Sequence, residues 1–547
     1  MKLTRTLFIL AISLLAKNIS AQCTEEDERR ILLIGDSWAF FMNQDQTFNN
    51  VADQYGHSNR VYHTVEDLAV NGARTEDFLT PASKDLLEAE LLANPTINVV
   101  HVSLGGNDFL GNWKVSFTPA ETEALKLETK DELEELFDHI WSIRPDIKIV
   151  YSGYMYANFE EVIEDSGLGA LHPFYGTWEG MEFPTFEQLN NILNEFAADM
   201  ISMASADSRL EYYHAPALMQ YHFGQDTPLT VDPFGSYPPF SQPLPEGDVT
   251  YPSPKETMRN YAIFVDCFHL SAEGYNVMIG YQFEKFYQKF LMDDIYLLSD
   301  VASETGTLTL TGGLSDTTLV IGDSGGNVHA GVLSFNTTLI ADTSIAAASI
   351  FLHRDSIQFG NPVGETFNLR MKTGFFGTSA DLETEDFDDL GDITGVACAF
   401  GESDDDGDWV RIDLPEEFLP LISNAEETQF FITISGATNE LVYYSSHTDP
   451  DYAPVLNIRY KYQFAGVEEM ELKEDLGIYP NPTSNQLNLI LPNDFKGIIS
   501  IVSITGEEVI STYDWTNGID VSHLASGSYI ITAIGDQKSY QGEFIKE

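Results

Sequence analysis

Short runs of aliphatic residues alternate with longer amphipathic stretches over the first half of the chain. Residues 31–34, 97–104 and 147–152 predict strands, and the first of them is apolar enough to be buried on both faces of a parallel sheet. Residues 125–140 and 186–202 place leucine, isoleucine and phenylalanine at helical spacing among charged residues. This alternation predicts an α/β domain over residues 22–299, with helices on both faces of the sheet.

The pattern changes at about residue 300. Residues 300–463 carry short, alternating, β-branched runs separated by Gly, Asp, Asn and Ser, which is typical of a β-sandwich. A charged linker is predicted over residues 464–475. Residues 476–547 contain further strand-like runs and turn glycines, and they predict a third, small, Ig-like β-sandwich.

The N-terminus has the pattern of a secretory signal peptide over residues 1–21. Two basic positions precede an apolar run, and small residues follow it. We expect the mature chain to begin at Gln22. A lipoprotein anchor on Cys23 is the alternative, but Gln22 is a poor fit to the small residue required before such a cysteine. No later run approaches the roughly 18 apolar residues of a membrane span.

The charge balance restricts the partners of the protein. Lys and Arg number 28 against 85 Asp and Glu, a formal net charge of −57, so phosphate backbones and anionic membranes are repelled and nucleic acid is excluded as a partner. The three cysteines are far apart, without a CxxC pair, and predict neither a disulfide framework nor a zinc site. No cofactor is expected.

Candidate chemistry follows the first predicted strand, where a Gly-Asp-Ser sequence presents Ser37 at the carboxyl edge of the sheet. A serine hydroxyl needs a base, an orienting acid and an oxyanion hole to act as a nucleophile. Gly72 lies in a short polar break, and Asn107 follows the second strand in a Gly-Gly-Asn-Asp sequence, so both can supply oxyanion donors. Asp266 and His269, three residues apart, can lie on one side of a turn as acid and base.

These four segments, in this order, resemble the SGNH or GDSL hydrolase family. The resemblance implies a flavodoxin-like α/β/α fold, a triad of Ser37, His269 and Asp266, and an oxyanion hole formed by Ser37, Gly72 and Asn107. It implies a two-step acyl transfer that requires no metal. The chain carries tryptophan directly after Ser37, where the family often has leucine or isoleucine; Trp38 is therefore a candidate for shaping the substrate pocket.

A second Gly-Asp-Ser sequence ends at Ser324, but no Gly-x-Asn-Asp or Asp-x-x-His follows it, so we interpret it as a turn. Residues 172–261 are dense in proline and aromatic residues and are too irregular for a simple connection. They predict either a lid or aromatic wall for substrate, with Trp178 and Phe223 as candidates, or an ordinary packed insertion. Cys267 is expected to be a buried free thiol.

The other two domains carry weaker resemblances. Residues 329–335, 345–354, 409–414 and 453–460 resemble DNRLRE-type β-sandwich modules, which implies a polysaccharide-binding or spacer module. The acidic residues 404–408 could hold Ca²⁺, although a solvated loop is the preferred interpretation.

The C-terminal Tyr-Pro-Asn-Pro sequence and the strand-like runs after it resemble the type A sorting domain of the type IX secretion system. That resemblance implies export across an outer membrane, with the secretion machinery as a partner, to the cell surface or the medium.

The sequence as a whole predicts a secreted serine esterase (EC 3.1.1.-). Acetyl esters of an extracellular polysaccharide or oligosaccharide are the preferred substrate. A lipolytic esterase that acts on acyl-lipid esters is the alternative among enzymes. A surface polysaccharide-binding protein with an idle hydrolase fold is the alternative outside them.

Overall fold

The computed structural model describes residues 28–546 with internal gaps. It divides the chain into two compact units, with the boundary in the sequence between residues 460 and 461. The predicted signal peptide, Cys23 and most of the predicted linker lie outside the described residues. The gaps are 59, 225–228, 232–234, 238–243, 300, 341–344, 359–365, 402–404, 423–424, 426, 435–438, 449–450, 461–473, 492–496, 504–507, 513–517, 523 and 536–538.

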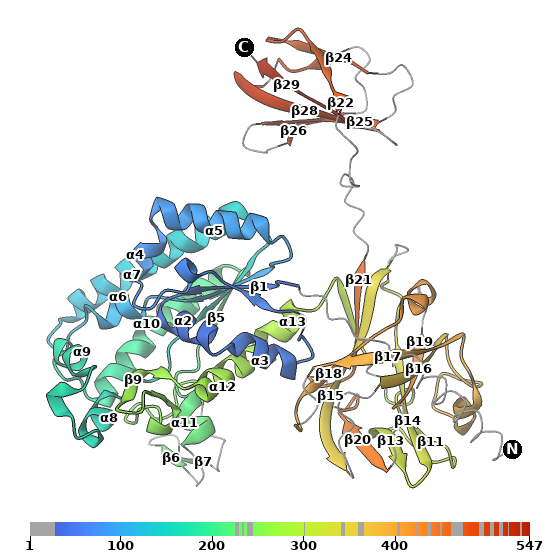
Figure 1. The fold of residues 1–547 in the computed structure, drawn as a ribbon, viewed down its shortest axis with the longest axis horizontal. Helices are drawn as coiled ribbons and strands as arrows, with labels where there is room; N and C mark the ends of the chain where they lie inside the picture. The colour runs from blue at the N-terminus through green and yellow to red at the C-terminus, as the bar shows by residue number, and fades with distance from the viewer. Residues whose placement is uncertain are drawn as a thin grey trace. The chain divides into compact units, whose positions relative to one another are not determined.

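The first unit begins with a five-stranded, fully parallel sheet (Figure 1). Its strand order β2-β1-β3-β4-β5 is the flavodoxin-like order, in which the chain changes direction across the sheet between β1 and β3. The carboxyl ends of these two strands therefore border the crevice where such folds bind ligands. The strands are β1 (Ile31–Gly35), β2 (Tyr62–His63), β3 (Val99–Ser103), β4 (Lys148–Ser152) and β5 (Leu210–Tyr213).

Helices cover both faces of this sheet (Figure 1). Ile31 and Leu33 of β1 pack against α2, α3 and α12, whereas Leu32 and Ile34 pack against α5, α7 and α10. All four side chains are fully buried, as the aliphatic run predicts. The helices are α2 (Ser37–Gln44), α3 (Thr47–Gln54), α4 (Thr75–Phe78), α5 (Pro81–Ala93), α6 (Gly106–Leu110), α7 (Pro119–Ile143), α8 (Phe159–Asp165), α9 (Tyr175–Gly180), α10 (Phe186–Ala206), α11 (Leu218–Phe223), α12 (Ala272–Gln282) and α13 (Gln288–Phe290).

The two long helices predicted from the hydrophobic spacing are confirmed as α7 and α10. Each begins with a capping box, in which the side chain of Thr118 or Thr185 accepts a hydrogen bond from the backbone three residues later. Glu121 and Gln188 complete the boxes by accepting from the cap residues. These local signals explain why both helices start where they do.

The middle region forms one twelve-stranded, barrel-like sheet. β15 pairs with β18, β20 and β21, and a β-bulge at Arg354 lets this long strand change partners along its length. The prediction of a β-rich region is confirmed. Hydrogen bonds join its strands into one connected sheet, and their arrangement as a β-sandwich stays a prediction. Its strands are β10 (Ile295–Leu298), β11 (Gly306–Thr309), β12 (Leu314–Ser315), β13 (Leu319–Ser324), β14 (Asn327–Phe335), β15 (Ile345–Gln358), β16 (Thr366–Thr373), β17 (Ile393–Phe400), β18 (Trp409–Asp413), β19 (Thr428–Ile434), β20 (Glu440–Tyr444) and β21 (Val455–Tyr460).

Strand β10 lies before residue 300 but pairs with β21, so the sheet of the middle region begins at Ile295. A network of charged side chains connects it to the parallel-sheet domain. Arg60 donates to both carboxylate oxygens of Asp293, at 2.9 and 3.1 Å, and Asn457 of β21 donates to the same carboxylate at 2.8 Å. Arg30 lies 3.5 Å from Asp293. The two domains therefore share a buried ion-pair network.

Four smaller expectations concern the cysteines and two loops of the middle region. The second Gly-Asp-Ser sequence was predicted to be a turn, but it forms the end of β13, where Ser324 pairs with Asn327; the turn is formed by Gly325 and Gly326, which follow it. Cys267 is a fully buried free thiol, and burial raises its pKa. Cys398 is disulfide-bonded, a bridge that the sparse cysteine spacing did not predict. Of the acidic loop, Asp408 lies 3.7 Å from the buried guanidinium of Arg354.

The second unit contains two sheets around a shared core that includes Leu487, Ile499 and Phe544. One sheet has the order β22-β29-β28-β25-β26 and the other β23-β24-β27. Across the parts of both units that the structure describes, no helix is long and apolar enough to cross a membrane. The strands are β22 (Glu474–Asp475), β23 (Gly477–Tyr479), β24 (Gln486–Ile490), β25 (Gly497–Ser503), β26 (Glu508–Thr512), β27 (Ile519–Asp520), β28 (Gly527–Gly535) and β29 (Ser539–Lys546).

Candidate active site

Ser37 lies at the tight turn from β1 into α2. Gly35 adopts φ +147°, and a Cβ there would lie 1.9 Å from the carbonyl oxygen of Ser103, so only glycine fits. Asp36 caps the helix by accepting from the N–H of Trp38 at 2.9 Å. As the first residue of α2, Ser37 presents its hydroxyl and its N–H at the carboxyl edge of the sheet.

His269 lies against Ser37, although 232 positions separate them in the chain. Its Nε2 is 2.6 Å from the Ser37 Oγ, and its Nδ1 is 2.9 Å from Oδ2 of Asp266. His269 and Asp266 belong to β9 (Val265–Leu270), which pairs with β8 (Met258–Asn260). Serine, histidine and aspartate therefore form one continuous line of hydrogen bonds.

Asp266 is held by the backbone around it. Its Oδ1 accepts from the N–H groups of Phe268 and His269, both at 2.8 Å, while Oδ2 faces the imidazole. The side chain is fully buried. Asp266 and His269 lie in β9 and not in the predicted turn, and the backbone hydrogen bonds to Oδ1 give the carboxylate a single orientation toward His269.

The predicted oxyanion donors come from segments next to Ser37 on the same edge. The segment that carries Gly72 is attached to β1 because the Val70 N–H donates to the Gly35 carbonyl at 2.9 Å. Gly72 has φ +83° and open space around it. Asn107 donates one amide hydrogen to the carbonyl of Ala73 at 2.9 Å, which leaves its second amide hydrogen for another acceptor.

Asp108 strengthens the link between these two segments. Both of its carboxylate oxygens accept from the Thr75 N–H at 3.2 Å, and the Thr75 hydroxyl donates to Oδ2 at the same distance. Burial raises the pKa of Asp108, which these hydrogen bonds counteract. The aspartate that ends the Gly-Gly-Asn-Asp sequence therefore holds these two segments together.

Tyr154 is a residue that sequence reasoning missed. Its hydroxyl is 2.6 Å from Oδ2 of Asp36 and 2.8 Å from the N–H of Gly106. Complete burial raises the pKa of Asp36 to about 6, and the hydrogen bond from Tyr154 opposes this rise. The only available signal was position, because Tyr154 follows β4 at the same edge of the sheet.

Aromatic rings surround His269. Phe41, Phe268 and Phe174 have ring centroids 4.9, 5.5 and 6.1 Å from the imidazole. Further out, Leu171 and Ile263 are 84% and 82% exposed. Their neighbours in sequence are in contact, because His172 packs against Phe264 at 5.6 Å. The surface near His269 is thus partly apolar.

The three aromatic residues predicted as substrate-binding candidates differ in their placement. Trp38 has no exposed surface and packs between Tyr154, Phe268 and Tyr275, so it supports the nucleophile turn from the core and does not line a pocket. Trp178 belongs to α9, which follows Phe174, and its indole donates to the carbonyl of Pro184. Phe223 ends α11, contacts the ring of His222 and packs against the hydrophobic cluster that contains Trp38.

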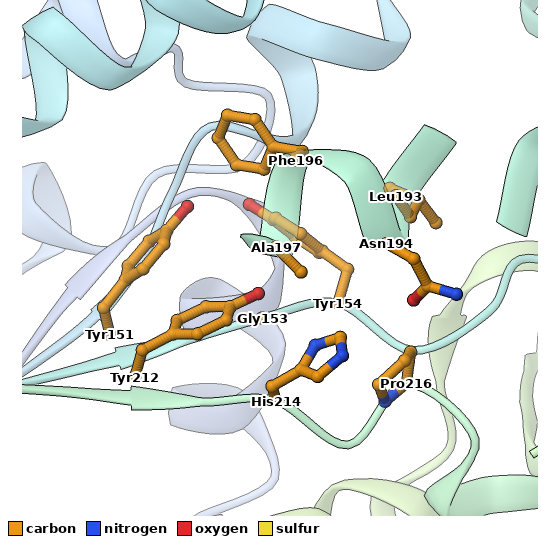
Figure 2. Close-up of a pocket in the computed structure, with 10 residues that line it drawn as sticks. All are labelled: Tyr151, Gly153, Tyr154, Leu193, Asn194, Phe196, Ala197, Tyr212, His214 and Pro216. Carbon is orange, nitrogen blue, oxygen red and sulfur yellow. The ribbon is translucent and has the colours of Figure 1, made fainter. Parts of the chain in front are cut away.

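One cavity lies beside the ends of β4 and β5, against α10 (Figure 2). None of the five predicted site residues lines it, so it is not the place where an ester would meet Ser37. Tyr154 links the cavity to the site, because it lines the cavity and its hydroxyl donates to Asp36, the residue before Ser37. Among the described residues, no group of three His, Cys, Asp or Glu side chains could hold a metal ion. The lining residues are Tyr151, Gly153, Tyr154, Leu193, Asn194, Phe196, Ala197, Tyr212, His214 and Pro216.

Comparison with protein families agrees with this geometry. Residues 33–277 match the GDSL-like lipase/acylhydrolase family. The N-terminal domain belongs to that family. Residues 477–547 match the secretion system C-terminal sorting domain. The chain therefore contains an ester-hydrolysing, GDSL-like acylhydrolase domain and a type IX sorting domain, which indicates secretion to the cell surface or exterior. The resemblance of the middle region to DNRLRE-type modules stays a prediction.

Several solved structures are similar over about half of this chain. A family 3 carbohydrate esterase of Clostridium thermocellum is 14% identical, covers 48% of this chain and 97% of its own, and has a TM-score of 0.27. A GDSL-like lipase of Bacteroides thetaiotaomicron is 14% identical over 51% and 97%, with a TM-score of 0.25. An extracellular lipase of Streptomyces rimosus is 15% identical over 47% and 99%, with a TM-score of 0.27. No curated protein matches the sequence. These similarities do not identify a substrate.

Proposed function

We propose that the protein is a secreted serine esterase in which Ser37 is the nucleophile, His269 the general base and Asp266 the residue that orients the base. The observation that supports this proposal is the line of hydrogen bonds from Ser37 Oγ through His269 to Asp266, at 2.6 and 2.9 Å. An unassisted hydroxyl is a weak nucleophile, and this arrangement supplies the proton acceptor that it needs.

In the first step, Ser37 Oγ attacks the ester carbonyl while its proton passes to Nε2 of His269. The bond to the alcohol then breaks, and His269 returns the proton to the leaving oxygen. An acyl group remains on Ser37. Water, deprotonated by His269, attacks this acyl-enzyme, releases the carboxylic acid and restores the serine.

The negative oxygen that develops in both steps needs hydrogen-bond donors. The N–H of Ser37, the N–H of Gly72 and the free amide hydrogen of Asn107 are the proposed donors. Among the described residues, the Gly72 N–H makes no internal hydrogen bond, so it is available for this purpose. Ser37 begins a helix, and its N–H is likewise unused within that helix.

For the substrate, we propose acetyl esters on an extracellular polysaccharide or oligosaccharide. The export signal supports this choice, because it places the enzyme where such polymers are found. Carbohydrate binding by residues 300–463 would support it further. Retention of the protein on polysaccharide gels tests that binding, and loss of retention after deletion of residues 461–547 would assign it to the sorting domain instead.

A second candidate is a lipolytic esterase that acts on longer acyl chains. The apolar surroundings of His269 favour it, since Phe41 and Phe174 contact the imidazole while Leu171 and Ile263 are mostly exposed. Exposed apolar groups beside a site can receive an acyl chain or an amphiphilic interface.

The two candidates differ in acyl-chain preference. Wild-type protein and Ser37→Ala should be compared on p-nitrophenyl acetate and p-nitrophenyl octanoate. Faster turnover of acetate supports the carbohydrate substrate, and faster turnover of octanoate supports the lipolytic one. Equal rates for wild type and Ser37→Ala on both esters would refute the proposed nucleophile and leave the polysaccharide-binding alternative.

A further inference from the structure

We propose that Tyr154 is a positioning residue for the reaction: its hydroxyl connects the turn that carries Ser37 to the start of α6, the helix that carries Asn107, and so keeps the oxyanion donors aligned with the nucleophile. This inference rests on the proposed function of Ser37. It concerns a side chain outside the four sequence segments that identify the site.

The direction of both hydrogen bonds at Tyr154 is determined by chemistry. The Gly106 N–H can only donate, so the phenol oxygen accepts it at 2.8 Å. The single phenol hydrogen is then left for Oδ2 of Asp36 at 2.6 Å. Tyr154 therefore relays a hydrogen bond from the start of α6 to the cap of α2. Because α6 also contains Asn107, this relay joins two parts of the proposed oxyanion hole.

The packing around Tyr154 shows that the connection is tight. A Cβ on Gly106 would lie 2.7 Å from Cζ of Tyr154, so the backbone at the start of α6 is in direct contact with the phenol ring. Trp38 packs edge-on against the same ring, with centroids 5.0 Å apart. The segment that carries Gly72 is tied to this helix by Asn107 and Asp108. Tyr154 therefore completes the only described side-chain relay from Asp36 to these tied segments.

The charge of Asp36 makes the connection stronger than a neutral hydrogen bond. Asp36 and Tyr154 are both almost entirely buried, and a buried carboxylate without its donor is costly. The charged and titratable groups that face Asp36 are His269 on β9, Asp108 on α6, Tyr151 on β4, Tyr154 just after β4, and Tyr275 on α12. Only Tyr154 donates a side-chain hydrogen bond to it in the described structure.

Tyr154 also forms part of the wall of the cavity in Figure 2, where its ring lies between the end of β4 and α10. Water in this cavity could occupy part of the space left by a lost hydroxyl. We therefore expect a Tyr154→Phe variant to keep some activity.

The chain offers a matched control in Tyr213. It ends β5, the strand next to β4, and is 2% exposed. Its hydroxyl is buried without a hydrogen-bond partner among the described residues. Tyr213→Phe therefore removes the same atom from the same edge of the sheet without breaking a connection to the site.

The test measures kcat and KM on p-nitrophenyl acetate, and inhibition by phenylboronic acid, which forms a tetrahedral adduct with a nucleophilic serine. In Tyr154→Phe we expect kcat to fall by about 10- to 100-fold, less than the loss for a direct oxyanion donor, with KM changed by less than about twofold. The inhibition constant of the boronate should rise in parallel with the loss of kcat, because both report tetrahedral binding. Tyr213→Phe should match the wild type in every measurement.

Wild-type kcat and boronate inhibition in Tyr154→Phe would overturn the inference. If instead the wild type is no more active than Ser37→Ala, the proposed function itself fails, so the two failures are distinguishable. If Tyr213→Phe lost as much kcat as Tyr154→Phe, the loss would come from removing any buried hydroxyl at this edge of the sheet, and the inference would also be overturned.

Asp36→Asn weakens the same connection from its other end and tests the inference even if Tyr154→Phe does not fold. The asparagine oxygen can still cap the Trp38 N–H, but the amide nitrogen cannot accept from the phenol hydrogen. It can only donate to the phenol oxygen, so the charge-assisted hydrogen bond to the carboxylate is lost. Its kcat should fall by about tenfold or more, and the double variant should lose little beyond the larger single loss. Full activity of Asp36→Asn, or additive losses in the double variant, would contradict the proposal.

Discussion

Asp266 offers a test in which activity and stability can be changed separately, because its two oxygens have different partners. Oδ1 accepts from the two backbone N–H groups of Phe268 and His269, and Oδ2 accepts from the imidazole. In Asp266→Asn, the two backbone donors require the amide oxygen in the place of Oδ1. The NH₂ group must then face Nδ1 of His269, which forces the imidazole to carry its proton on Nε2.

A His269 with its proton on Nε2 cannot accept the proton of Ser37. We therefore expect kcat to fall by about 10³- to 10⁴-fold, which corresponds to about 4–5.5 kcal/mol of activation free energy. The free energy of unfolding should change by less than about 1 kcal/mol, since the backbone hydrogen bonds remain. In Asp266→Ala both buried N–H groups lose their acceptor, and the loss of stability should be about 2–6 kcal/mol.

The assay combines ester hydrolysis with urea unfolding for the wild type and both variants. Nearly full activity in Asp266→Asn would refute the assignment of Asp266 as the residue that orients His269. Equal losses of stability in the two variants would show that the carboxylate is not held by the backbone as described.

Three further predictions concern other parts of the chain. Asp293→Ala leaves the buried guanidinium groups of Arg30 and Arg60 with one acceptor fewer, so we expect a loss of about 3 kcal/mol in the free energy of unfolding, and a loss below ~0.5 kcal/mol would contradict it. Folding raises the pKa of Asp36 from 3.8 to about 6, which favours its protonated form, so its contribution to stability falls as the pH rises from about 4 to 6. Relative to Asp36→Asn, the wild type should therefore lose about 3 kcal/mol over this range, and parallel pH curves would refute it. Ser324→Ala should leave ester hydrolysis unchanged, because this serine ends a hairpin strand; reduced kcat would show a second site.

The sequence predicted those parts of the fold that depend on local patterns. The aliphatic run of β1 has to be buried, and the capping boxes of α7 and α10 are local, so these elements could be placed in advance. The start of the middle region was harder to predict. Strand β10 pairs with β21, more than 150 positions away, and no local signal separates it from the preceding domain.

The candidate site also depends on contacts between distant residues, which the sequence alone does not show. The four sequence segments indicated Ser37, Gly72, Asn107, Asp266 and His269, but only the fold shows that Ser37 and His269 come within 2.6 Å. Trp38 was expected to shape a pocket, yet its ring faces the core because it lies on the inner side of α2. Tyr154 could not be recognised, since a tyrosine after a buried strand has no pattern that separates a packed ring from a functional hydroxyl.

The most direct test of the account is covalent labelling with a fluorophosphonate, which reacts with activated serines. The label should be found by mass spectrometry on the peptide that contains Ser37, and it should be lost in His269→Ala. Ser324, the serine of the second Gly-Asp-Ser sequence, provides an internal control and should stay unlabelled. Absence of label on Ser37 in active protein, or an equal label on Ser324, would contradict the central claim.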